Sequence, residues 1–103
     1  MSVSRTTSLG IKEALDRWVA FAAADAKIGK VVATPPKTSG TDKRLTWRAK
    51  AVGGSLLMFT SEVRPNGKTA LIAQQSMLPS HEANLAAKKF WAAVLERFVE
   101  EDR

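Results

Sequence analysis

The chain contains no cysteine and only one histidine, His81. Without cysteine there is no disulfide scaffold, no thiolate nucleophile and no cysteine-based zinc site. One histidine among scattered acids does not suggest a metal centre. His81 and its neighbour Ser80 would lie next to each other at the start of a helix. Successive side chains on a helix do not face each other, so this pair has poor geometry for a Ser–His–Asp triad. We find no catalytic constellation and expect His81 to be a solvated surface residue.

Long apolar runs and nucleotide-binding motifs are also missing. The N-terminal region has no signal-peptide layout, and its longest apolar stretch, 18–24, is too short to span a membrane. Gly53-Gly54 lacks the glycine spacing of a dinucleotide site, and no P-loop is present. These absences predict a cytoplasmic protein with no membrane contact, no metal and no cofactor.

The 103 residues that are present suit one domain, which we take as 1–103, with 45% hydrophobic and 25% charged residues. The net charge of +6 is unevenly distributed, because residues 26–79 hold nine bases against two acids. Such a segment attracts anions, although a solvated surface is the simpler interpretation.

Periodicity predicts a mixed α+β fold. Alternating apolar and polar residues indicate strands, apolar residues at helical spacing indicate two helices, and Pro35-Pro36 and Asn66-Gly67 mark breaks. The predicted elements, in chain order, are a strand at 3–7, a helix to about 25, an optional strand at 30–34, a loop or extended edge at 35–42, strands at 43–50, 55–64 and 68–77, and a helix that Ser80 caps. The fold class is therefore a small antiparallel sheet with a long C-terminal helix, in the order β-α-(β)-β-β-β-α.

Two stretches carry a family resemblance: the strand Lys68–Leu78 that ends in Leu-Pro, and the helical Ala-Ala-Lys-Lys-Phe-Trp ending at Trp91. They resemble the end of START-like (SRPBCC, helix-grip) domains, in the branch related to the activator of the Hsp-ninety ATPase. The resemblance implies a curved antiparallel sheet that grips a C-terminal helix, often around an apolar ligand. The chain departs from the family by being shorter, and by carrying Gln75 where many relatives have a histidine.

Four aromatic residues are expected to point into the space between helices and sheet: Trp18, Trp47, Phe59 and Trp91. With Gln75 as a polar handle they could line a box for an apolar or amphipathic ligand, or they could simply fill the core. Our first functional hypothesis is a non-enzymatic module that binds such a ligand or a protein partner. A small cyclase-like or hydrolase-like enzyme is the weakest alternative.

The outer sheet face suggests two further partners. Leu56 and Met58 alternate with inward-facing residues and are expected to face outward, which predicts a homodimer through the outer face or an exposed edge strand. The basic segment could also bind an anionic polymer. Nucleic acid is the less favoured partner, because Trp47 is the one aromatic interleaved with these bases at the spacing of a stacking platform, and it is expected inside.

Overall fold

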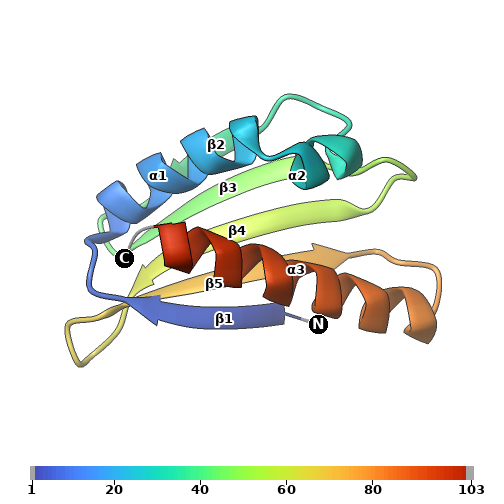
Figure 1. Ribbon diagram of the computed structural model, residues 1–103. Coiled ribbons are helices and arrows are strands. Elements are labelled where there is room, and N and C mark those ends of the chain that lie inside the picture. Colours follow the sequence, from blue (N-terminus) through green and yellow to red (C-terminus); the bar gives the residue numbers. More distant parts are fainter. Residues whose placement is uncertain (1, 102–103) are drawn as a thin grey trace.

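A computed structural model describes residues 2–101 of the chain, and the side chains of residues 2–100. Its elements are β1 (Ser2–Thr7), α1 (Ile11–Ala24), α2 (Ala26–Val31), β2 (Lys37–Gly40), β3 (Arg44–Lys50), β4 (Leu56–Val63), β5 (Thr69–Ser76) and α3 (His81–Glu101). All strands join one antiparallel sheet in the order β1-β5-β4-β3-β2 (Figure 1). The α+β class and the predicted element order are confirmed.

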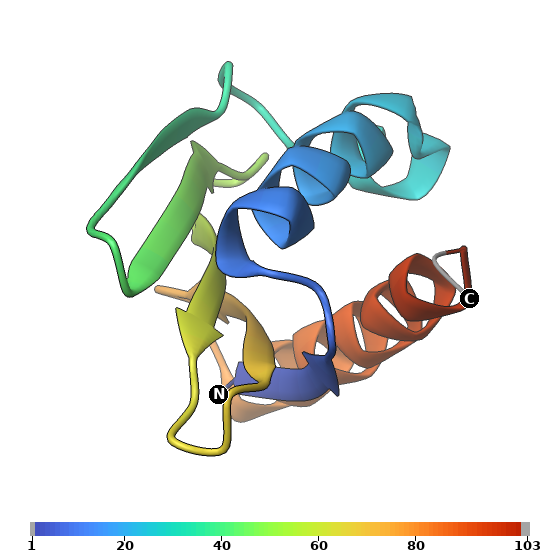
Figure 2. The same ribbon diagram turned by 90° about the vertical axis from the view of Figure 1, so that its left-hand side faces the viewer.

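Both long helices cover the same face of the sheet, as Figure 2 shows from the side. α1 packs on β3 and β4, and α3 packs on β5 and β1. The strand residues alternate accordingly: Leu57, Phe59, Leu71 and Ala73 are buried beneath the helices. We call the opposite side, which no helix covers, the open face of the sheet.

The predicted turn and cap residues act as expected. Gly67 has φ +82°, and its hairpin closes where the Arg64 N–H donates to the Lys68 carbonyl at 2.8 Å. The Ser80 hydroxyl accepts the Ala83 N–H at 3.1 Å at the start of α3. These local signals place β4, β5 and α3 where the sequence predicts them.

The predicted strand at 30–34 is wrong, because residues 26–31 form the short helix α2. The Asp25 carboxylate caps this helix, accepting from the Lys27 N–H at 2.9 Å and the Ile28 N–H at 3.0 Å. The strand lies instead at β2, within the stretch predicted as a loop or an extended edge. The chain between them bridges Val32 to Ala51 before the two prolines interrupt the pairing.

Asp25 also joins the N-terminal helices to α3. Its other carboxylate oxygen lies 3.0 Å from an Arg97 guanidinium nitrogen, and its side chain is only 13% exposed. Burial alone would raise the pKa of Asp25, but the Ile28 N–H, the Arg97 guanidinium and the Lys27 N–H together outweigh burial and lower it. The carboxylate is therefore held ionised in the folded protein.

In the described part of the chain, no helix is both long and apolar enough to cross a membrane.

Candidate functional site

The four aromatic side chains predicted as a ligand box do meet between helices and sheet. Trp18 stacks on Phe59 with ring centroids 4.1 Å apart, and Trp47 stands edge-on to Trp18 at 5.6 Å. Trp91 lies 6.5 Å from Trp18, and none of the four is more than 3% exposed. The rings fill the layer by packing on one another, which is the arrangement of a core. A ligand role for them stays a prediction.

Gln75 faces the helices, and its amide is engaged within the protein. The Trp91 Nε1–H donates to Gln75 Oε1 at 3.0 Å, and Gln75 Nε2–H donates to the Ser55 hydroxyl at 2.8 Å. The amide thus ties α3 to the residue that precedes β4. Among the described side chains, only the Trp18 Nε1–H is buried without a hydrogen-bond partner.

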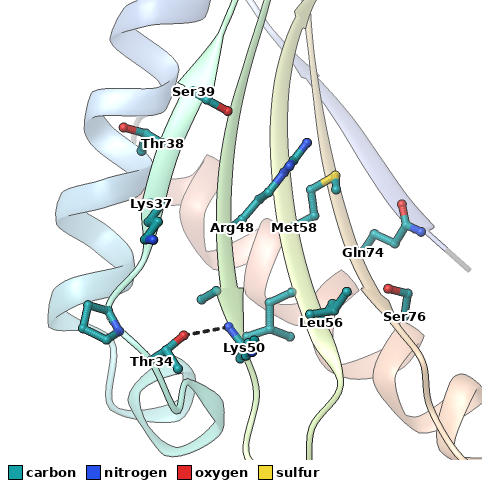
Figure 3. Close-up of a pocket in the computed structure, with 13 residues that line it drawn as sticks. Thr34, Lys37, Thr38, Ser39, Arg48, Lys50, Leu56, Met58, Gln74 and Ser76 are labelled. Atoms are coloured by element: carbon teal, nitrogen blue, oxygen red, sulfur yellow. Dashed lines mark hydrogen bonds between the residues drawn. The ribbon is translucent and has the colours of Figure 1, made fainter.

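The other candidate residues, Leu56 and Met58, lie on the open face, where the structure has a groove of about 930 Å³. Figure 3 shows the groove crossing β2, β3, β4 and β5 near one end of the sheet. One of its walls is the segment around Thr34 and Pro35. The Thr34 hydroxyl accepts the backbone N–H of Lys50 at 3.0 Å, which fixes this wall against β3.

Strand register orders the groove into two rows across the sheet. In the first row Lys37 pairs with Arg48, Arg48 with Met58, and Met58 with Gln74. In the second row Lys50 pairs with Leu56, and Leu56 with Ser76. Each row therefore has cations on β2 or β3, an apolar side chain on β4 and a neutral polar side chain on β5. Adjacent strands lie about 4.8 Å apart, so the four strands span about 14 Å.

The charge on this face is strongly asymmetric. Glu62 is the one acidic residue in the five strands, and it lies away from the groove, 2.7 Å from Arg44. Within residues 2–100, no carboxylate lies within ion-pair distance of the Lys37, Arg48 or Lys50 side chains. The groove is thus a cationic patch beside an apolar strip, with no internal counter-charge.

The sequence predicted that Leu56 and Met58 face outward and that the bases gather in the middle segment, but it did not join them into one site. The missing step was the register that brings Arg48 beside Met58 and Lys50 beside Leu56. Gln74, Ser76 and Lys37 were missed as site residues. Alternation on β5 could have placed Gln74 and Ser76 on the outer face, whereas β2 was too short and polar to predict as a strand.

The described residues contain no cluster of metal-binding side chains. No group of three His, Cys, Asp or Glu side chains there is placed to hold a metal ion. His81 is exposed at the first residue of α3, as predicted. What the groove offers chemically is attraction of negative charge and burial of apolar surface.

Comparisons with protein-family models, with curated proteins and with solved structures found no match for this chain. The START-like resemblance therefore stays a prediction from the sequence.

Proposed function

We propose that this chain is a non-enzymatic binding module for a small amphipathic molecule, and that the ligand lies on the open face of the sheet. The observation that carries the proposal is the groove of about 930 Å³ that combines apolar and polar side chains. Its size lies in the range of small-molecule sites, which is roughly 300–1,000 Å³. The aromatic layer on the other face supports the proposal indirectly. Its rings already pack on one another, so a ligand is better placed on the open face.

Leu56 and Met58 supply the apolar contact in this proposal. Leu56 is 40% exposed, so a ligand that covers it removes apolar surface from water. Met58 lies beside it and is flexible enough to adapt to an uneven ligand. The two residues thus account for binding of an apolar part without disturbing the core.

Nucleic acid is a weaker candidate for the same face. All seven aromatic residues of the chain belong to the helices or to strand positions beneath them, so the open face has no ring on which bases could stack. Any binding of an anionic polymer would rest on charge alone and weaken steeply with salt.

The proposal is tested with the dye 1-anilinonaphthalene-8-sulfonate, whose fluorescence rises in apolar sites. Leu56→Gln and Met58→Gln should each weaken dye binding about tenfold, a loss of about 1.4 kcal/mol. Leu85→Gln is the matched control, because Leu85 is 48% exposed on α3. The open-face site would be contradicted if Leu56→Gln and Met58→Gln bound the dye as tightly as Leu85→Gln does. It would also be contradicted if Leu85→Gln weakened dye binding as much as they do.

A further inference from the structure

We infer that the groove selects single-chain amphiphiles with an anionic head group, and that Lys37, Arg48 and Lys50 bind that head. This inference rests on the proposed function and adds the sign of the charge and the orientation of the ligand. The head lies over β2 and β3, and the chain runs across Leu56 and Met58 on β4 towards Gln74 and Ser76 on β5.

The arrangement of charge in the groove favours an anionic head group. Lys37 and Arg48 are direct cross-strand neighbours, and Lys50 is two residues from Arg48 on the same face of β3. Like charges placed opposite one another destabilise a sheet unless an anion lies between them. Since no carboxylate among the described side chains pairs with these three, a bound anion would relieve their repulsion.

The rest of the same face differs from the groove in how its charge is paired. Arg44, which also points outward from β3, is neutralised by Glu62 at 2.7 Å. Arg44, which lies away from the groove, therefore has a carboxylate partner, whereas the cations in the groove have none in the part of the molecule that the structure describes. Arg48 can bind two oxygens of a carboxylate, sulfate or phosphate at once, while the lysines add charge.

The length of the groove suits a short amphiphile. Both rows turn from cationic to apolar within one strand spacing, about 4.8 Å. Each row then reaches a neutral polar side chain on the next strand, β5. A molecule about 14 Å long, with its charge at one end, fits this order, whereas a long polymer or a uniformly charged ion does not.

The test uses calorimetric titration with decyl sulfate, decyltrimethylammonium and decyl glucoside, each below its micelle concentration, and with inorganic sulfate alone. Decyl sulfate should bind at least about tenfold more tightly than the other three ligands. The double variant Lys37→Gln/Lys50→Gln and the single variant Arg48→Gln should each remove most of this preference. The control is Lys43→Gln/Lys68→Gln, which lowers the net charge equally at the other end of the sheet.

The outcomes separate the two proposals. Equal binding of decyl sulfate and decyl glucoside, both weakened by Leu56→Gln, would overturn the anionic-head inference and leave the open-face site standing. An equal loss in the control variant would also overturn the inference, because the preference would then reflect net charge. If none of the three decyl ligands binds, both proposals fail. If inorganic sulfate binds as tightly as decyl sulfate, the apolar chain has no role and the inference is wrong.

Discussion

At the scale of single residues, Gln75 shows how an interior polar group can look like a ligand handle in the sequence. Its amide accepts from the Trp91 indole and donates to the Ser55 hydroxyl, which itself is only 5% exposed. Gln75 therefore stabilises the fold by satisfying a buried donor, and its role follows from partners far away in the sequence.

Replacing Gln75 with leucine should lower the free energy of unfolding by about 1–3 kcal/mol, because the Trp91 Nε1–H loses its acceptor inside the protein. Gln74→Leu is the matched control, since the adjacent side chain faces the open side and should change stability by less than about 0.5 kcal/mol. Chemical denaturation measures both. Equal losses in the two variants would show that the Gln75–Trp91 hydrogen bond contributes nothing specific.

At the scale of secondary-structure elements, α3 closes the core through one apolar side of the helix. Trp91, Val94, Leu95 and Phe98 are each at most 4% exposed, whereas Leu85, nearer the start of the helix, is 48% exposed. The helix therefore depends on its later turns for packing.

Trp91→Ala should destabilise the protein by about 3–5 kcal/mol, the range for deleting a large buried aromatic side chain. Leu85→Ala should change the unfolding free energy by less than about 0.5 kcal/mol, because its side chain is half in solvent. Thermal and denaturant unfolding measure these differences. A small effect of Trp91→Ala would contradict the packing of α3 on β5.

The junction of α1, α2 and α3 at Asp25 should make stability depend on pH. Because the pKa of Asp25 is lower in the folded than in the unfolded chain, its contribution is fully present above the unfolded value of about 3.9. It is lost as the pH falls through the folded-state pKa.

The unfolding free energy of the wild type minus that of Asp25→Asn should therefore be positive at neutral pH and shrink on acidification below about pH 4. Denaturation at a series of pH values measures it. Asp16→Asn is the control, since Asp16 is 66% exposed beside Lys12 on α1. If the difference in unfolding free energy between the wild type and Asp25→Asn stayed constant with pH, Asp25 would not be an ionised, buried helix cap.

At the scale of the whole molecule, the sheet has two different faces, and the sequence predicted them unequally. The face beneath the helices follows from strong local signals, namely alternation in β3 to β5, the Asn66-Gly67 turn and the Ser80 cap. β2 carries four exposed polar or small residues and no apolar signal, so its pairing with β3 could not be predicted. The groove could not be predicted either, because it exists only once β2 and β3 are in register.

The homodimer stays a prediction, and the proposed site on the open face would limit how it can form. Two copies meeting face to face would bring the Lys37, Arg48 and Lys50 side chains of both together, which electrostatic repulsion opposes. Pairing through the other edge strand, β1, leaves the groove free, because no β1 residue lines it. Light scattering should then give twice 11.2 kDa in physiological salt, and a mass near 11.2 kDa would contradict the dimer.

In the function that we propose, ligands bind the open face of the sheet and not the aromatic layer beneath the helices. Nuclear magnetic resonance of the protein titrated with decyl sulfate tests it directly, because the two faces carry different reporters. We predict shifts of the Met58 methyl and the Gln74 side-chain amide, with the indole N–H signals of Trp18 and Trp91 unchanged. Shifts of the indole signals without shifts at Met58 would contradict the claim and place the ligand in the core.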